Sequence, residues 1–505
     1  MIQAVTALVT RSLQMDSRSL TTHLTRLATV TGIYIALSCV IAIATRFGAP
    51  GFRFFSSSVY LNSIALTLIG ISSFSTTITE EKEEDTLGLM IMAGISPLGL
   101  LIGKTGGRLI QVLILMMLQY PFVLLTVTLG GVSSVQIQSA YLGMASYVVM
   151  LAGLGLLTST IAASSRTSGT WMAILIAAYM LVPYLCGELA ASTAVNRKSP
   201  WISLLLTTIS SSSLFMRISD ILTSGYGESP WSLQVISNCI LGLVCFGLAW
   251  CCFGWALRSS STEAISRGAL TRQKKGFGRT FAPGRAWSNP LIWKDFHFVS
   301  GGLSMRLTRF VLYSGLLFVC CGLTSLWGMG HQSGAILGMY QIFLLFAISW
   351  ETAMLTSRCI HDEVRGQTLS TLVMLPTTTF RLFYSKLFGT LLGAYPGYLF
   401  FLVTNLIGIE SVQDFLIDGP GLLFVSHFLL VPHLSAVYSF WVRWGAVSLG
   451  IGTMVGLFSV WVVLADFIAF FGTDELNEIG VFVLILCGLC HIVILFQIRS
   501  VATRA

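Results

Sequence analysis

The sequence predicts an all-α polytopic membrane protein with about 12 transmembrane helices, arranged as a tandem repeat of two six-helix units. Composition is the first reason: of 505 residues, 54% are hydrophobic and 10% are charged, with a mean hydropathy of +0.81. A soluble domain carries roughly a quarter charged residues, so a soluble globular protein is excluded. The second reason is that the apolar residues form twelve long stretches whose spacing recurs in the two halves of the chain.

Each apolar stretch is long enough to cross a bilayer, for which a helix needs about 20 mostly apolar residues. The predicted spans are 28–45, 59–78, 109–129, 139–163, 169–187, 232–257, 310–328, 337–356, 387–409, 421–440, 445–465 and 479–498. Because 28–45 follows a polar start without a small-residue cleavage site, it is expected to be a retained span and not a signal peptide. The segment 188–231 between the fifth and sixth spans is expected to hold short re-entrant or surface helices.

The basic residues predict the orientation in the membrane. With twelve spans both termini lie on one side, and that side holds 24 of the 29 Lys and Arg residues. Since cytoplasmic loops are enriched in Lys and Arg, both termini are expected in the cytoplasm, in an integral plasma membrane protein, most simply of a bacterial inner membrane. Loops facing an anionic lipid bilayer account for the net charge of +8, and no nucleic-acid partner is expected.

The two halves of the chain are related by a shift of 282 residues, which places the first five spans on spans seven to eleven without a gap. Six spans is an even number, so both units have the same orientation. We predict a first unit over 1–257, a basic cytoplasmic linker over 258–288 and a second unit over 289–505. Residues 289–294 align with 6–11, and each unit is expected to open with a short helix in the headgroup plane; a frayed tail is the alternative.

The cytoplasmic loop after the second span of each unit is the most informative segment. An acidic stretch leads into a Thr-Leu pair, a short apolar run, a proline and a lysine that opens the third span. At the 282-residue offset the loops share five identical pairs: Glu81 and Glu363, Thr86 and Thr368, Leu87 and Leu369, Met92 and Met374, and Lys104 and Lys386.

Negative charge and side-chain acceptors favour a helix start, so each loop predicts a short amphipathic helix that Pro97 or Pro376 stops. Its apolar side is formed by Leu87, Met90 and Ile91 in the first unit and by Leu369, Leu372 and Val373 in the second. Such a helix can rest on lipid or dock in a groove of a soluble partner, and these physical arguments favour neither.

This loop pattern resembles the membrane subunit of type-two ABC exporters, the ABCG-like permeases, and the resemblance covers both units. It implies that the loop helices are coupling helices for two ATP-binding cassette ATPase subunits on separate chains. ATP and Mg would bind to those subunits, so no cofactor and no catalytic residue is expected here, and the chain is not expected to be an enzyme. The residues that match the coupling role are Glu81, Glu84, Thr86, Leu87, Met90 and Lys104 in the first unit and Glu363, Thr368, Leu369, Leu372 and Lys386 in the second. The first loop is the more acidic, which allows the two docking faces to differ.

Motifs for other chemistry are weak in this sequence. A phosphate-binding loop is excluded at Gly99 and Gly103, because three residues separate these glycines where four are needed, and no soluble stretch is long enough for an ATPase domain. His427 and His433 are six residues apart and do not share a helix face, so a packing role or a polar interhelical bond is expected for them, and no metal site.

Glu351 is the one Asp, Glu, Lys or Arg inside a predicted span, which makes it a functional candidate by default. It lies about one turn from the cytoplasmic end, so an interfacial role is equally open. An ion-coupled secondary transporter is the first alternative function, although carriers usually bury several charges near the midplane. A membrane-embedded enzyme lacks paired carboxylates or a nucleophile and base at membrane depth. A non-transporting membrane anchor for a cytoplasmic complex remains open.

Overall fold

The computed structural model describes residues 2–17, 50–84, 86–162, 165–191, 200–223, 226–268, 285–326, 333–407, 420–441 and 475–504, with single positions between 23 and 37. All regular structure in this part of the chain is helical, and it contains no strand. Seven of its helices are long and apolar enough to cross a membrane. The chain is therefore a helical membrane protein.

The seven helices coincide with predicted spans. They are Gly51–Glu83, Pro97–Leu129, Ser134–Ile161, Thr167–Tyr184, Leu233–Gly254, Thr379–Thr404 and Val483–Ser500. Three further helices, α14 (Gly302–Leu326), α15 (Ser333–Arg365) and α19 (Pro420–Trp441), overlie the predicted spans 310–328, 337–356 and 421–440. The predicted spans 28–45 and 445–465 lie mostly or entirely outside the described residues.

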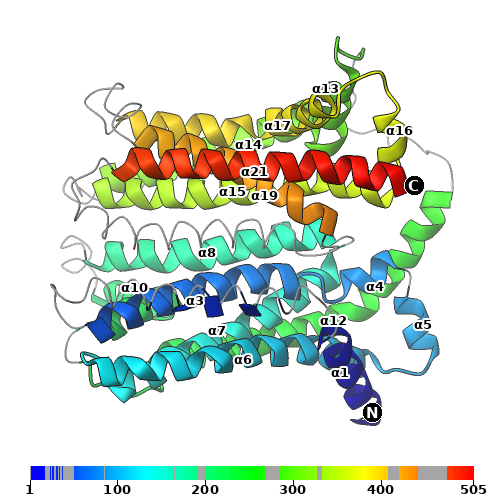
Figure 1. Cartoon of the computed structure of the whole chain (residues 1–505). Helices are drawn as coiled ribbons and strands as arrows, with labels where there is room; N and C mark the ends of the chain where they lie inside the picture. The colour runs from blue at the N-terminus through cyan, green and yellow to red at the C-terminus, as the bar shows by residue number, and fades with distance from the viewer. Residues whose placement is uncertain are drawn as a thin grey trace. The chain divides into compact units, whose positions relative to one another are not determined.

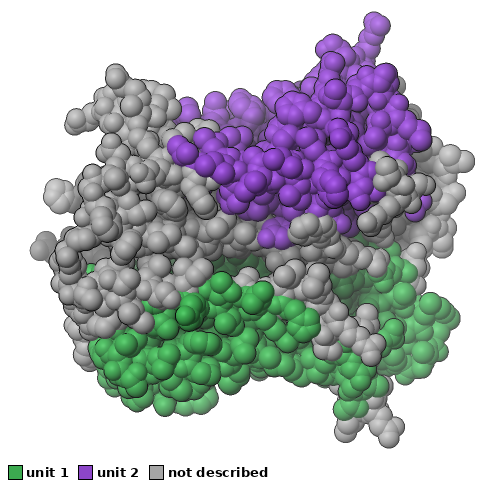
Figure 2. Space-filling view, in the orientation of Figure 1, with its two compact units in different colours: residues 1–272 green, residues 273–505 purple. Residues whose placement is uncertain are grey.

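The chain divides into two compact units, Met1–Arg272 and Gln273–Ala505 (Figure 2). This boundary falls inside the predicted linker 258–288. The first part of that linker continues the helix α12 (Leu233–Gly268), whereas residues 269–284 lie outside the described part of the chain. The linker thus begins as helix, which its serines and basic residues did not indicate.

In the first unit α7 (Ser134–Ile161) is the central helix, and it packs against α3 (Pro50–Phe74), α6 (Pro97–Leu129), α8 (Ser165–Ala191) and α12 (Figure 1). Glycines permit these close approaches. A Cβ atom on Gly155 would lie 2.4 Å from Cβ of Phe74, and one on Gly153 would lie 2.2 Å from the carbonyl oxygen of Gly242. The helices pack at distances that a larger side chain would prevent.

The second unit repeats these pairings. α15 packs against α17 (Thr379–Ile407) and α19, as α3 packs against α6 and α7. α19 packs against α21 (Glu475–Arg504), as α7 packs against α12.

Each unit opens with a short helix, as predicted, and this helix packs on the third predicted span of its unit. α1 (Ile2–Ser17) packs on α6, and α13 (Pro290–Lys294) with the π-helical turn η2 (Asp295–Val299) packs on α17. A Cβ atom on Gly107 would meet Ser12 at 2.7 Å, and one on Gly389 would meet the carbonyl oxygen of Ile292 at 2.7 Å. Because Gly107 and Gly389 are 282 residues apart, the two openings occupy equivalent places in their units.

The segment between α8 and α12 holds the expected short helices, α10 (Pro200–Ser210) and α11 (Leu214–Ile221). They meet at a bend of 86°. Arg217 on α11 is 8% exposed and donates to Glu228 Oε2 at 2.6 Å, which holds the following loop against the helix.

Candidate functional site

The two predicted loop helices are present as α5 (Leu87–Met92), which follows the short α4 (Thr79–Glu83), and as α16 (Leu369–Val373) (Figure 1). Both begin at the leucine of the Thr-Leu pair. The prolines do not stop them as predicted. α5 ends at Met92, Gly94 follows with φ 81°, and Pro97 is the first residue of α6. Pro376 lies in the turn after α16.

Thr86 and Thr368 precede the helices without capping them, because neither side chain bonds to a backbone N–H of the first turn. Their hydroxyls donate instead to the carboxylates of Glu81 and Glu363. The backbone N–H groups of the same threonines donate to the carbonyl oxygens of the same glutamates, at 3.0 and 3.1 Å. The carboxylates of Glu81 and Glu363 therefore hold the threonines, and neither threonine side chain caps the helix that follows it.

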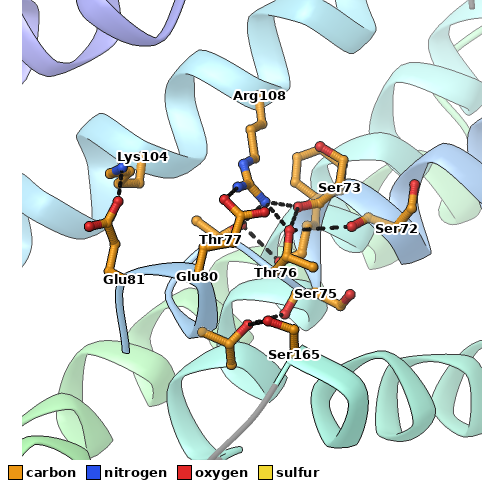
Figure 3. Close-up of polar contacts among 12 residues, drawn as sticks. Ser72, Ser73, Ser75, Thr76, Thr77, Glu80, Glu81, Lys104, Arg108 and Ser165 are labelled. Atoms are coloured by element: carbon orange, nitrogen blue, oxygen red, sulfur yellow. Dashed lines mark hydrogen bonds and ion pairs between the residues drawn. The ribbon is translucent and has the colours of Figure 1, made fainter. Parts of the chain in front are cut away.

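A lysine from the third predicted span, on α6 or α17, completes each arrangement. Lys104 on α6 forms an ion pair with Glu81 (Figure 3), and Lys386 Nζ on α17 lies 2.9 Å from Glu363 Oε1. The glutamate side chains are 10% and 8% exposed. The structure thus brings together six of the predicted site residues as two equivalent sets, which we call the first triad (Glu81, Thr86, Lys104) and the second triad (Glu363, Thr368, Lys386).

The predicted apolar residues lie on the inner face of each loop helix. Leu87 and Leu369 are 4% and 5% exposed, and Met90 and Leu372 are half-buried. The outer face carries exposed apolar side chains, and the identical pair Met92 and Met374 are 78% and 83% exposed.

The rest of the acidic run in the first unit is engaged in internal contacts. Glu80 Oε2 accepts from Arg108 Nη2 at 2.6 Å, and Arg108 also binds Thr76 Oγ1 at 2.7 Å (Figure 3). Lys82 Nζ donates to the carbonyl oxygens at the end of α7, at 2.6 Å for Thr160 and 2.9 Å for Ala162.

Glu83 Oε1 accepts from the backbone N–H of Ser165, the first residue of α8, at 2.8 Å. Of the predicted coupling residues in this run, Glu84 is exposed. In this loop Glu80 and Glu81 therefore hold α6, Glu83 holds the start of α8, and Lys82 holds the end of α7.

The second triad is linked to the opening helix of its unit. Lys386 Nζ lies 2.9 Å from Asp295 Oδ2, and Lys294 Nζ lies 2.8 Å from Glu363 Oε1. Asp295 is fully buried. Sequence reasoning missed both residues, although the alignment of 289–294 with 6–11 placed an opening helix at each unit.

Electrostatics favours the ionised form of Glu363. Burial raises its pKa, but hydrogen bonds from Lys294 and Thr368 and the charge of Lys386 outweigh burial and lower the pKa from 4.5 to about 2. For Asp295 burial has the larger effect and raises the pKa, an effect that Lys386 only partly offsets.

Glu351, the predicted intramembrane carboxylate, is ion-paired. It binds Arg309 Nε, with the two side chains 12% and 13% exposed, and its Oε2 accepts from Tyr313 Oη at 3.3 Å. Arg309 also donates to the carbonyl oxygens of Ser300 and Gly393 at 3.0 and 3.1 Å. In this arrangement Glu351 joins α14 to α15.

His433 makes the expected polar interhelical bond. Its Nδ1 lies 2.6 Å from the carbonyl oxygen of Leu429, so this nitrogen carries the proton, and its Nε2 accepts from Tyr384 Oη at 3.1 Å. The side chain of His427 lies outside the described residues. Within the described part of the chain no group of three or more His, Cys, Asp or Glu residues is placed to hold a metal ion.

No protein-family model matches this chain, and no curated protein matches it significantly.

Proposed function

We propose that the chain is the membrane permease subunit of an ABC transporter, an exporter powered by ATP-binding cassette ATPase subunits on separate chains. The observation that carries the proposal is the repeated triad, because the same three side chains tie a short helix to the third span in each unit. A helix held in this way can transmit force from a bound partner to the membrane helix that carries the lysine.

The proposal includes twelve spans in two equivalent six-helix units. Helices α15, α17, α19 and α21 pack against one another in the same pattern as α3, α6, α7 and α12, and this pattern supports the two equivalent units. The excess of Lys and Arg on one side supports cytoplasmic termini and loop helices, and a bacterial inner membrane is the proposed location.

The outer faces of α5 and α16 are the proposed docking surfaces. Met92 and Met374 are more than three-quarters exposed, and flexible thioether side chains suit a groove in a partner protein. Leu89 on α5 is also exposed, at 61%. One ATPase subunit would bind each helix, and ATP and Mg would bind to those subunits.

Affinity purification of the tagged chain from its native membrane, followed by mass spectrometry and an ATP hydrolysis assay, tests the proposal. We expect a P-loop ATPase with the native chain and at least a tenfold loss of it with the double variant M92E/M374E, because a carboxylate at each docking surface disfavours an apolar contact. The matched control M92L/M374L keeps the surfaces apolar and is expected to retain the ATPase. An absent ATPase, or equal capture by all three proteins, contradicts the proposal.

A further inference from the structure

The start of the second unit carries more positive charge than the neighbouring carboxylates neutralise. Residues 285–309 contain one carboxylate, Asp295, and four cationic side chains: Arg285, Lys294, Arg306 and Arg309. Asp295 is fully buried and pairs with Lys386. Lys294 and Arg309 have carboxylate partners on other helices. Two arginines, Arg285 and Arg306, have no carboxylate partner among the described residues.

Arg306 is unusual because it is half-buried. Of the Lys and Arg side chains in the second unit whose burial the structure describes, four are buried or half-buried: Arg306, Arg309, Arg358 and Lys386. The last three form ion pairs. The five N–H donors of Arg306 have no hydrogen-bond acceptor in the described part of the chain. Since a charge taken out of water is costly unless it is paired, Arg306 indicates a partner that is not part of the protein.

Two aromatic rings position the guanidinium group. Cζ of Arg306 lies 5.6 Å from the ring centroid of Phe296 on η2 and 6.0 Å from that of Tyr395 on α17. Phe296 is 3% exposed and stacks on Trp287, with 5.3 Å between the ring centroids. Ring faces attract a cation but take up none of its ordinary hydrogen bonds. The guanidinium is therefore held in place with its N–H donors unused.

The surroundings of Arg306 face lipid. Apolar side chains on α14 and α17 that are 37–50% exposed lie around it along the chain: Met305, Leu307, Phe310, Tyr395 and Leu399. Arg306 precedes the predicted span 310–328 by four residues, and a long cationic side chain at the end of a span reaches the headgroup level. Trp287 is 42% exposed, and tryptophan is enriched at this level of a membrane.

The sequence before Trp287 adds to the positive charge. Residues 267–285 contain six Lys or Arg and no Asp or Glu. A cluster of four to eight Lys and Arg residues next to a membrane-spanning helix is typical of segments that attract anionic lipid. An anionic headgroup therefore fits this place better than a neutral one.

We propose that the start of the second unit binds the phosphate headgroup of an anionic phospholipid, with Arg306 as its principal ligand. A guanidinium group donates two parallel N–H bonds to one phosphate group, and the exposed Arg285 supplies a second positive charge. The acyl chains would lie against the apolar side chains of α14 and α17. Because η2 is joined to the second triad through Asp295 and Lys386, a bound lipid would hold this triad as well.

The sequence assigns this site to the second unit alone. Residues 306–309 read Arg-Leu-Thr-Arg and align at an offset of 283 with His-Leu-Thr-Arg at 23–26. His23 thus replaces Arg306, and a histidine has no guanidinium fork. We expect one tightly bound anionic lipid per chain.

Native mass spectrometry of the purified chain in mild detergent tests the proposal. The added lipid is dioleoyl-phosphatidylglycerol or, for comparison, dioleoyl-phosphatidylcholine. We expect one phosphatidylglycerol to bind with a Kd at least tenfold lower than that of phosphatidylcholine. R306Q is expected to raise this Kd at least tenfold, and R306K about threefold, because lysine keeps the charge without the fork. The matched control R381Q removes an exposed arginine of α17 and is expected to bind as the native chain does.

Inorganic phosphate in excess distinguishes a lipid from a free anion, and it is expected to displace no phosphatidylglycerol. Displacement by phosphate, equal binding of the two lipids, or unchanged binding in R306Q overturns the proposal. Thermal unfolding without added lipid is expected to be the same in R306Q and the native chain; a lower unfolding temperature in R306Q would assign Arg306 to internal packing and contradict the proposal. These measurements use no ATPase and do not depend on the proposed function.

Discussion

Glu81 and Glu363 are both buried carboxylates, and different cationic side chains neutralise them. Each is a carboxylate about nine-tenths buried, and a buried charge is tolerated when it is paired and hydrogen-bonded. Glu81 has one lysine, Lys104. Glu363 shares Lys386 with the fully buried Asp295, and Lys294 supplies a second positive charge. The positive and negative charges are equal in number in each unit, one of each sign around Glu81 and two of each sign around Glu363. Neutralisation of Glu363 therefore depends on more residues.

This difference predicts unequal effects of removing the lysines. K386M leaves Asp295 and Glu363 with Lys294 alone, and breaking a buried ion pair costs about 3–5 kcal/mol. K104M is expected to cost less, because the Lys104 side chain is 25% exposed against 7% for Lys386. Thermal unfolding in detergent measures both. The control K294M removes a charge that is 47% exposed and is expected to cost about 1 kcal/mol or less. A larger loss in K104M than in K386M contradicts this account.

The lowered pKa of Glu363 predicts acid sensitivity. In the folded state the pKa of Glu363 is about 2, against an ordinary value of 4.5, so its carboxylate stays ionised down to a lower pH. Its contribution is therefore complete above pH 4.5 and is lost as the pH falls toward 2. We expect the unfolding temperature of the native chain to fall between pH 5 and pH 3, roughly the upper part of this window, and to fall less in E363Q. D362N, at an exposed neighbouring position, is the control and should keep the native decline. Parallel pH curves for E363Q and the native chain would refute the assignment.

At the scale of elements, local sequence patterns predicted the positions of the helices better than they predicted which side chains pair with one another. Hydropathy placed the spans over α3, α6, α7, α8, α12, α17 and α21, because burial in lipid acts on each segment separately. The recurrence of Glu, Thr and Lys located the triads. The expectation that side-chain acceptors open these helices is not met by Thr86, because its hydroxyl donates to the Glu81 carboxylate and makes no cap hydrogen bond. Asp295 was missed because its lysine partner lies 91 residues away, a distance that no local pattern spans.

The contact of α3 with α7 yields a prediction about helix packing. In G155A the new Cβ would lie 2.4 Å from Cβ of Phe74 and 2.7 Å from its backbone carbonyl carbon, so the helices must separate. We expect a loss of about 1–3 kcal/mol, measured by unfolding in detergent. G247A is the matched control on α12, because a Cβ there meets nothing within 4 Å and alanine favours helix. A G155A variant as stable as G247A would show that α7 can shift without cost.

For the whole molecule, the repeat predicts how many ATPase subunits one chain binds. One chain offers two docking surfaces, so under the proposed function it should bind two ATPase subunits, measured as the mass of the purified complex. The single variants M92E and M374E are each expected to leave one subunit bound. A complex that needs two copies of this chain, or one from which M92E alone removes both ATPase subunits, contradicts the prediction.

The contacts of Lys82 and Lys294 also bear on how the chain is made. Lys82 binds carbonyl oxygens as far as 80 residues downstream, whereas Lys294 lies 69 residues upstream of Glu363. At a synthesis rate of about 5–20 residues per second, the first loop waits roughly 4–16 s for the end of α7 to leave the ribosome. The second loop meets an anchor that has already been synthesised. Translation therefore sets opposite orders for these two contacts, because the partners of Lys82 are made after it and Lys294 is made before its partner Glu363.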